Sequence, residues 1–571
     1  AEMRRTMPWE RGSWAICVAA CVVVCASGAS SSGLGGRVVM NRMMLRGGNG
    51  AEGSKAGDGR VSAVKRLFSD AHGADDLLSG SFRGARGTPK RITVRGGKSA
   101  TDGAMQDGGE QGQAIDEALY SRQLYVLGHD AMRRMQQARI LLVGLGGLGV
   151  EIAKDLALAG IKSLTLHDSA EVTWTDLSSQ FYCTEEDIGK NRAEVSLPHI
   201  ASLNRNVAID VLEGPINASA LEQFSLVICS DNLFGECVRV NEACREGGVK
   251  FIMAQTRGVY SNVFVDMGRG FEVTDTDGEQ ALSAMISAIS SDTPAMVTTL
   301  DEQRHGLSDG DMVTFSEVQG MEQLNGIAPM PIKVTGPYTF TIGDTSKMGA
   351  YKSGGYVHQV KQPAKVDFLP LREALRNPTF TTSDFAKMER ERQLLVGFQA
   401  IDSFKVQTGG LPRPATKADA DVVVEMAEQF NSEVQTDDGE VINVPLVEEV
   451  DEKLVRRMAY GAQGQLAPMA SVVGSIVAQE ALKAISGKFM PLSQFFVFDA
   501  EEILPERELD DEAEFEGEEG RYDGQVACLG RSVQEQLGNL TYFLVGAGAI
   551  GCEMLKNWAM MGVACGEGGG V

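Results

Sequence analysis

The sequence predicts an α/β protein that contains two Rossmann-like units in tandem. Residues 120–161 match residues 522–563 without a gap, at an offset of 402 residues. Each segment reads as a short apolar strand, a glycine-rich turn and a helix, which is how a dinucleotide-binding unit begins. The offset far exceeds the roughly 20 to 50 residues of a solenoid repeat. We therefore predict two copies of one domain, the second of which is cut off at the end of the chain.

The first copy supplies the elements of this unit in the order that the fold requires. They are a strand at 140–143, a turn at 144–149, a helix at 150–159, and strands at 163–167, 226–229 and 250–253. The strands are short apolar runs, and Gly160 ends the helix.

From about residue 264 the periodicity changes. Residues 312–318 and 332–342 alternate apolar and polar side chains, with glycine and proline turns between them. This pattern predicts a small inserted β-barrel domain over residues 264–360. Helical spacing follows at 369–406, 417–434 and 449–485, and residues 494–498 read as a buried strand.

An acidic segment separates the two repeats. Residues 506–519 hold nine acids and one arginine in fourteen positions. Repulsion between like charges keeps such a run extended and solvated. We predict an acidic linker at 506–520, before the start of the second copy at 521–571.

The length and the charge limit the classes of function. A chain of 571 residues is long enough for roughly three to five domains. Residues 1–100 carry 16 Lys and Arg against 7 Asp and Glu, a balance of +9, so the total of −24 leaves −33 on the rest. An acidic body excludes nucleic acid as an expected partner. Proteins or small anionic ligands fit better.

The basic N-terminal region reads as a targeting segment. An apolar run at 15–26 follows Arg4, Arg5 and Arg11, and is too short to make a stable membrane span. Residues up to 97 are rich in Gly, Ser and Arg, which is typical of a transit peptide. Residues 1–114 therefore resemble a bipartite leader of algae with complex plastids. The alternative is an over-extended gene model or a disordered tail.

The ten cysteines form no CxxC pair, which argues against a zinc ribbon or a redox motif, and we expect no metal site. Three of them, Cys17, Cys21 and Cys25, fall in the leader. The other seven are expected to be reduced and mostly buried, and two of them, Cys552 and Cys565, are expected to be packing residues. The seven are Cys183, Cys229, Cys237, Cys244, Cys528, Cys552 and Cys565.

The first copy contains a dinucleotide fingerprint. Gly144, Gly146 and Gly149 follow the first strand, and Asp168 ends the next one. The glycines let the backbone approach phosphate oxygens, and the acid is placed to hold a ribose hydroxyl. Alone, this motif is compatible with NAD, with ATP, or with a site that has lost its ligand.

Longer sequence segments decide between these three alternatives. They include YSRQLYVLGHDAMRRMQQARILLVGLGGLGVEIAKDLALAGI, TDLSSQFYCTEEDIGKNRAEV, KVTGPYTFTIGDT, LAPMASVVGSIVAQEALKAISGKFMPLSQFFVFDA and YFLVGAGAIGCEMLKN. In this order they resemble the N-terminal half of the E1 ubiquitin-activating enzymes, members of the ThiF-like adenylating family. The resemblance covers residues 120–569.

This resemblance implies a domain plan. An inactive adenylation domain would be split over 115–263 and 449–505. It would enclose the inserted β domain at 264–360, called the first catalytic-cysteine half-domain, and a four-helix bundle at 361–448. Residues 521–571 would start the active adenylation domain.

By the same resemblance, the first copy lacks the chemistry of adenylation. Ser178 and Ser179 stand where an active domain has the Asn and Arg of SNLNRQF. Phe234 stands where the pattern DNxDAR has a magnesium-binding Asp, and a phenylalanine does not bind a hard cation. The first glycine turn and Asp168 are therefore expected to maintain the fold.

Two features are implied to act on ATP. Arg122 matches a family arginine that reaches into the ATP site of the active domain, where its planar guanidinium grips phosphate. The alternative for Arg122 is a surface ion pair. The active-type nucleotide loop of the second copy consists of Gly546, Ala547, Gly548, Ala549, Ile550 and Gly551.

The implied activity is Mg²⁺- and ATP-dependent adenylation of the C-terminus of ubiquitin or a ubiquitin-like protein, followed by cysteine thioester formation and transfer to an E2 conjugating enzyme. The chain ends before the family's catalytic cysteine, so we expect an incomplete N-terminal part, inactive alone. The alternatives are a non-catalytic subunit of a heterodimeric E1 and an NAD-dependent oxidoreductase. The family implies cytoplasm and nucleus, and a functional leader at 1–97 would imply a plastid-associated compartment.

Overall fold

The computed structural model describes residues 115–300, 304–432, 445–504, 511–566 and 569, with the backbone of short strands at 91–94, 436–437 and 440–441. The apolar run at 15–26 and the cysteines Cys17, Cys21 and Cys25 lie outside these residues. Within them, no helix is both long and apolar enough to cross a bilayer.

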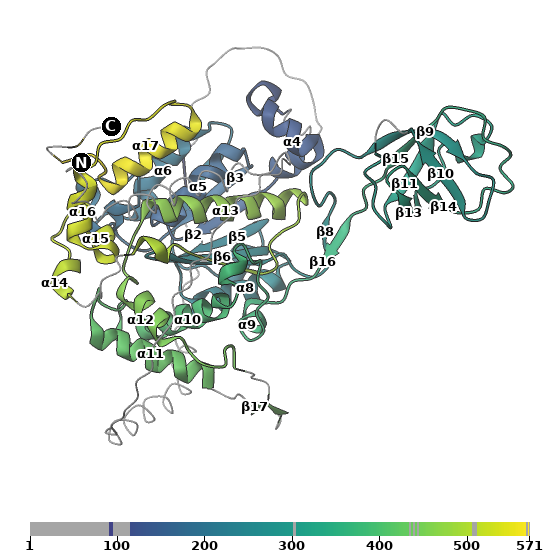
Figure 1. Ribbon diagram of the computed structural model, residues 1–571. Helices are drawn as coiled ribbons and strands as arrows, with labels where there is room; N and C mark the ends of the chain where they lie inside the picture. The colour runs from purple at the N-terminus through teal and green to yellow at the C-terminus, as the bar shows by residue number, and fades with distance from the viewer. Residues whose placement is uncertain are drawn as a thin grey trace, which may run out of the picture. The chain divides into compact units, whose positions relative to one another are not determined.

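The main sheet has eight strands in the order β1-β4-β3-β2-β5-β6-β7-β19 (Figure 1). The strands are β1 (Arg91–Val94), β2 (Arg139–Val143), β3 (Ser163–His167), β4 (Ala208–Leu212), β5 (Leu226–Ser230), β6 (Lys250–Arg257), β7 (Tyr260–Asp266) and β19 (Phe495–Asp499). The five strands from β4 to β6 are parallel, and β1, β7 and β19 pair antiparallel. The predicted α/β class is confirmed.

Two boundaries differ from the sequence expectation. Strand β1 lies inside the segment read as leader, yet its backbone pairs with β4, from Arg91 against Leu212 to Val94 against Ile209. The run Arg-Ile-Thr-Val is rich in β-branched residues, which favour strands. Strand β7 keeps residues up to Asp266 in the main sheet, because it pairs along its whole length with β6. The inserted domain therefore begins after Asp266.

Two hydrophobic cores cover the opposite faces of the main sheet. Strand β2 sends Ile140 and Leu142 into one core, and Leu141 and Val143 into the other, as the two-residue period of a strand requires. The first core is closed by α5 (Gly147–Ala159), α6 (Arg192–Leu203) and α13 (Ala467–Ser486). The second is closed by α8 (Phe234–Glu246), α9 (Leu371–Ala374), α10 (Arg390–Thr408), α11 (Lys417–Ser432) and α12 (Glu452–Tyr460).

The helical region is less continuous than its periodicity suggests. Helical spacing predicts a helix from 369, but the long helix α10 begins only at Arg390. Pro378 and the polar run that follows it interrupt the segment, since proline excludes helical geometry from the residue before it. Helices α10, α11 and α12 pack on one another.

The inserted β domain is a seven-stranded antiparallel sheet with its own hydrophobic core. Its order is β12 (Met330–Pro331), β11 (Met312–Ser316), β15 (Tyr356–Gln359), β9 (Ser283–Ile289), β10 (Ala295–Thr299), β14 (Thr339–Ile342) and β13 (Lys333–Gly336). The two edge strands β12 and β13 are separated in sequence only by Ile332. The sheet therefore curls until its edges lie side by side, close to the predicted barrel. The ribbon of β8 (Phe271–Val273) and β16 (Ala364–Val366) joins it to the chain.

The repeat is visible in the backbone. Helix α17 (Ala549–Met561) lies at the same offset of 402 residues from α5 at both ends. Gly144 and Gly546, which open the two turns, have φ of 94° and 99°. Helix α4 (Glu117–Met135) bends at Gly128, where the second copy divides into α15 (Asp523–Leu529) and α16 (Arg531–Gly538) at Gly530.

The two copies differ in the strand before the turn. In the first copy, β2 lies between β3 and β5, and Leu141 is fully buried. In the second copy, Phe543 and Val545 are 90% and 83% exposed. No strand of the described residues flanks this segment.

Candidate functional site

The first glycine turn is shaped by close packing of the chain on itself. A Cβ atom on Gly144 would lie 2.2 Å from the carbonyl oxygen of Ser230, and one on Gly149 would lie 2.0 Å from the carbonyl oxygen of Gly144. A side chain at either position would displace backbone. Gly146, the residue before α5, faces open space. Two of the three fingerprint glycines are thus explained by strand-to-helix packing alone.

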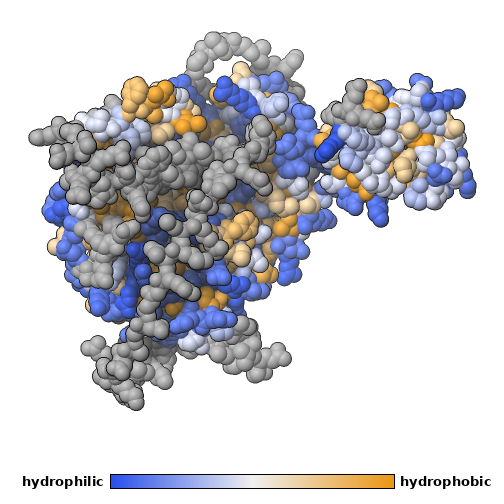
Figure 2. Space-filling model, viewed as in Figure 1, coloured by the Kyte–Doolittle hydropathy of each residue, from blue (hydrophilic) through white to orange (hydrophobic). Residues whose placement is uncertain are grey.

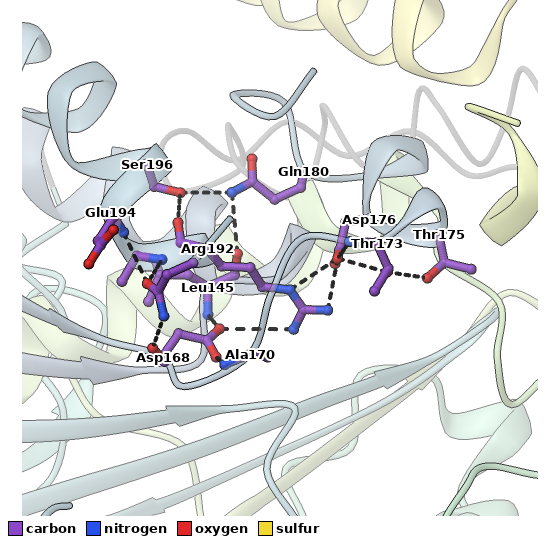
Figure 3. A network of polar contacts seen from close by, with 12 residues as sticks. Leu145, Asp168, Ala170, Thr173, Thr175, Asp176, Gln180, Arg192, Glu194 and Ser196 are labelled. Carbon is purple, nitrogen blue, oxygen red and sulfur yellow. Dashed lines mark hydrogen bonds and ion pairs between the residues drawn. The ribbon is translucent and has the colours of Figure 1, made fainter. Parts of the chain in front are cut away.

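The acid of the fingerprint already has partners within the protein (Figure 3). Asp168 accepts the backbone N–H of Leu145 at 2.7 Å through Oδ2 and that of Ala170 at 2.8 Å through Oδ1. Arg192 lies 3.9 Å from Asp168 and donates to Asp176 at 2.8 Å. The carboxylate that would hold a ribose in a working site is thereby engaged by its own loop.

Gln180 fills the space beside the same turn. Its side chain is fully buried, and its Nε2 donates to the hydroxyl of Ser196 at 2.8 Å and to the carbonyl oxygen of Leu145 at 3.3 Å. These contacts support the expectation that the first turn maintains the fold.

Ser178 and Ser179 hold other parts of the protein in place. The Ser178 hydroxyl accepts the backbone N–H of Gly524 at 3.0 Å and donates to the carbonyl oxygen of Arg521 at 2.9 Å. Ser179 donates to Gln465 at 3.2 Å. Both serines are buried. The small residues that replace the family's Asn and Arg therefore make room for the start of the second copy.

The segment around Phe234 is also closed. The backbone N–H of Phe234, whose side chain is buried, donates to Asp402 of α10 at 2.9 Å. Asp231 has a left-handed backbone with φ of 58° and pairs with Arg257 at 3.2 Å. Burial raises the pKa of Asp231 and of Asp402, and Arg257 opposes this rise in both.

No group of three or more His, Cys, Asp or Glu side chains is placed to share a metal ion in the part of the chain that the structure describes.

Arg122 lies on an exposed face of α4. Among the described residues it makes no hydrogen bond or ion pair. The helix is held by Tyr120, whose buried ring lies against Gly160 and whose hydroxyl accepts Nδ2 of Asn204 at 3.0 Å. The second copy repeats the anchor, since Gly562 lies against Tyr522. Tyr120 thus fixes the helix while Arg122 projects away from its contacts.

An arginine does not fit at the equivalent position of the second copy. Gly524 is buried, and a Cβ there would lie 2.7 Å from Cβ of Gln465 and 3.0 Å from the Ser178 hydroxyl. The difference between Arg122 and Gly524 is therefore imposed by the contact between the copies.

The second glycine turn is open. Residues 546–550 are exposed, whereas Leu145, Gly147 and Leu148 of the first turn are buried. No side chain caps the start of α17. Backbone N–H groups at such a helix start attract phosphate oxygens. Figure 2 shows hydrophobic residues at the surface near α17, where Ile550 is 60% exposed.

A cluster of four charges joins the two copies. We call it the charge square: Glu151 and Lys154 of α5, with Glu553 and Lys556 of α17. Lys154 donates to Glu553 at 3.0 Å, and Lys556 pairs with Glu151. Within each helix, Lys154 pairs with Glu151 and Lys556 with Glu553, both at 2.8 Å. Each charge therefore has a partner on both helices.

The square perturbs its members. Burial opposes the charge on Lys154, but the carboxylates of Glu151, Asp155 and Glu553 outweigh it and raise its pKa well above the usual range. Partial burial disfavours ionised Glu553, yet Lys556 and Lys154 lower its pKa overall. The Glu and Lys of this square were matched in the sequence repeat. Their contact needed the structure, because a repeat does not show which faces meet.

Two cysteine expectations are wrong. Cys183, Cys229, Cys237, Cys244 and Cys528 are free and buried, as expected, but Cys552 and Cys565 are free and exposed. Cys552 lies in the first turn of α17, on the side of the open loop. Cys565 lies after that helix.

The described part of the acidic segment is mostly exposed but is anchored at one point. Residues 505–510 lie outside the described part, but α14 (Glu512–Phe515) is helical and Phe515 is 2% exposed. Its side chain lines a small enclosed space with Tyr260 of the main sheet, Tyr460 of α12 and Cys528 of α15. One aromatic ring therefore anchors a run that its charges predict to be extended.

The chain is similar to known proteins over most of its length. The model of the ThiF family matches residues 120–514. The chain is 50% identical over 472 residues to ubiquitin-like modifier-activating enzyme 1 of Homo sapiens, covering 82% of this chain and 44% of that protein. It is 46% identical over 464 residues to the protein of that name from Dictyostelium discoideum, covering 81% and 44%.

A third relative, ubiquitin-activating enzyme E1 1 of Schizosaccharomyces pombe, is 44% identical over 456 residues, covering 80% of this chain and 44% of the relative. The chain thus spans less than half the length of these relatives. The solved structure of E. coli MccB with succinimide overlaps 27% of this chain and 50% of that chain at 23% identity. Its TM-score of 0.24 is too low to assign the fold.

Proposed function

The chain belongs to the ThiF family, and from this membership we propose that it is part of an E1 enzyme that activates ubiquitin or a ubiquitin-like protein. One observation carries the proposal. The first turn is filled by Gln180, and its acid, Asp168, accepts the backbone N–H groups of Leu145 and Ala170. A first copy that is closed in this way suits an enzyme whose single adenylation centre is built on the second copy.

The reaction begins with a carboxylate that is a poor acyl donor. Its oxygen becomes a good leaving group once AMP is attached, and Mg-ATP supplies that group. The acyl group then passes to a cysteine as a thioester, and from there to an E2 conjugating enzyme. These later steps belong to the whole protein, which we propose to be of the length of its relatives.

The open loop of the second copy fits the phosphates of ATP. As in the first copy, the N–H groups at the helix start lack a side-chain cap, and a Cβ on Gly548, like one on Gly146, would meet nothing within 4 Å. The second turn has no counterpart of the buried Gln180 among the described residues. Gly546 supplies the left-handed turn. We assign no residue of the described part to Mg²⁺, because no cluster of ligands is present there.

Arg122 is proposed to act on the same ATP. It is exposed and has no partner among the described residues, and a guanidinium is suited to phosphate because it donates several hydrogen bonds in one plane. The first copy thus contributes one side chain to the centre while its own site maintains the fold. The remaining domain plan follows the family, with an inactive adenylation domain, the inserted β domain, a four-helix bundle and the start of the active domain.

ATP–pyrophosphate exchange tests the proposal. The complete protein with ubiquitin should exchange label between pyrophosphate and ATP, and should form a thioester that a thiol reagent cleaves. Residues 1–571 alone should exchange none, since the resemblance assigns to them the inactive adenylation domain and only the start of the active one. Exchange by residues 1–571, or its absence from the complete protein with every ubiquitin-like protein tried, would reject it.

The alternatives make different predictions. A non-catalytic subunit of a heterodimeric E1 would restore exchange only when mixed with a second polypeptide. An oxidoreductase would bind NADH with micromolar affinity, and the engaged Asp168 argues against this. The compartment is proposed from the family to be cytoplasm and nucleus. A fluorescent fusion of residues 1–110 would reveal a plastid-associated compartment instead.

A further inference from the structure

The contact between α5 and α17 has the symmetry of a twofold axis. Glu151 and Glu553 are equivalent positions of the repeat, as are Lys154 and Lys556. Glu151 pairs with Lys556, and Glu553 pairs with Lys154. The glutamate of each helix therefore pairs with the lysine of the other helix. Such an exchange occurs only where two like helices face one another across a local twofold axis.

The square leaves little freedom for either helix. The side chains of Glu151, Lys154 and Lys556 are 4%, 16% and 10% exposed, and that of Glu553 is 48% exposed. Helix α13 closes the cluster, because the Ser471 hydroxyl contacts Glu151 at 3.0 Å and Asn557 at 3.1 Å. A Cβ on Gly474 would lie 2.8 Å from Cβ of Glu151. A shift of α17 would thus separate buried charges, which is costly.

The position of the square matters because α17 carries the open loop at its start. Glu553 lies two residues after Gly551, and Lys556 one turn further on. The helix is the rigid connection between the loop and the square. Whatever holds these charges therefore holds the loop in place against the first copy.

We propose that the charge square sets the position of the second glycine loop relative to the first copy, and that Glu151 and Lys556 are positioning residues for adenylation. This inference rests on the proposed function. In this proposal, none of the four side chains contacts the nucleotide. They act by fixing α17 so that the second glycine loop and Arg122 contact the same phosphates.

The test uses the complete protein and compares variants by turnover per active site, counted by the initial burst of acyl-adenylate. Glu151→Gln should lower this rate at least tenfold and change KM for ATP less than threefold. The full swap Glu151→Lys, Lys154→Glu, Glu553→Lys, Lys556→Glu keeps all four pairs and should recover most of the rate. The control is Glu242→Gln. Glu242 is an exposed acid of α8, on the other face of the main sheet, and it pairs with Arg372 of α9.

A second measurement is made on residues 1–571, without any activity. Hydrogen exchange of the amides of residues 546–556 should accelerate in Glu151→Gln and return to the parent rate in the full swap. If Glu151→Gln only lowers Tm and the rate per active site is kept, the square is merely stabilising and the inference is wrong. If the complete parent protein shows no ATP–pyrophosphate exchange at all, the proposed function is wrong.

Discussion

The hydroxyl of Ser178 accepts the backbone N–H of Gly524 at 3.0 Å, across 346 residues of sequence. Both residues are buried, so this N–H has no access to water. By the family resemblance, Ser178 stands where an active domain has an asparagine, and Gly524 stands where the first copy has Arg122. In the structure, each substitution permits the other.

Replacing Gly524 by Ala should weaken the docking of α15. The new Cβ would lie 2.7 Å from Cβ of Gln465 and 3.0 Å from both Oγ of Ser178 and the carbonyl oxygen of Thr175. We expect a loss of about 1–3 kcal/mol, as for an overpacked core. Hydrogen exchange of residues 523–529 measures it. Gly235→Ala is the matched control, because a Cβ there meets nothing within 4 Å. Equal effects of the two variants would contradict the steric argument.

Phe515→Ala should release the acidic segment from the body. Removing a buried aromatic ring costs about 3–5 kcal/mol, and few other apolar side chains of this segment are present to compensate. Tm should fall, and the amides of α14 and of the start of α16 should exchange faster, because Glu514 caps the N–H of Ser532 at 2.9 Å.

Phe515→Leu should lose much less, since it keeps most of the buried volume. If Phe515→Ala matched the parent protein in both readouts, the acidic run would be a spacer after all.

Arg122→Ala in the complete protein should slow adenylation while leaving the fold intact. A donor to charge that develops in the transition state is worth on the order of 2.7–4 kcal/mol, or about a hundredfold to a thousandfold in rate. Arg122 is exposed and Tyr120 holds the helix, so Tm should not change. Arg133→Ala on the same helix is the control, because its only role is an exposed pair with Asp130 at 2.6 Å. An unchanged exchange rate for Arg122→Ala would refute the role.

The contact of α5 with α17 should weaken in acid. Glu553 has a folded-state pKa below its ordinary value of 4.5, so its ionised form is favoured by folding. Its contribution is complete above pH 4.5 and is lost as the pH falls through the lowered folded value. Fluorescence of Trp558, which is buried in α17, reports the loss when the other three tryptophans, Trp9, Trp14 and Trp174, are replaced by Phe. Glu553→Gln should flatten the part of this titration that lies below pH 4.5.

Thiol labelling should divide the described cysteines into two groups. Cys552 and Cys565 are exposed and should react with iodoacetamide in the native state at pH 8. Burial raises the pKa of Cys183 and of Cys528 to about 12, so both should react only after denaturation. Mass spectrometry of the labelled peptides checks this. Native labelling of Cys528 would mean that α15 detaches readily.

The sequence predicted what depends on local pattern. The strand at 163–167 agrees at both ends, because an apolar run between a turn and a charged residue leaves no other register. The helix after the first turn begins at Gly147, three residues before the predicted start, because glycines that serve the turn also form its first helical turn.

Contacts between distant segments were not readable from the sequence. Phe515 is one aromatic residue among acids, and only the pocket formed by Tyr260, Tyr460 and Cys528 makes it an anchor. Cys552 follows a helical pattern that suggests a buried face, and its exposure depends on what covers α17. The alternation of 332–342 continues through Gly336 and Pro337, yet the chain reverses there into the hairpin of β13 and β14.

The charge square also has a consequence for gene duplication. A helix that carries Glu and Lys three residues apart is complementary to a reversed copy of itself. A domain with this pair can therefore associate with an identical domain, and doubling it within one gene requires no new contact. After duplication, a reversal of charge at position 151 requires a reversal at position 556 to keep the pair. Positions 154 and 553 are linked in the same way. The two cross-helix pairs thus require the same two residue types in both segments.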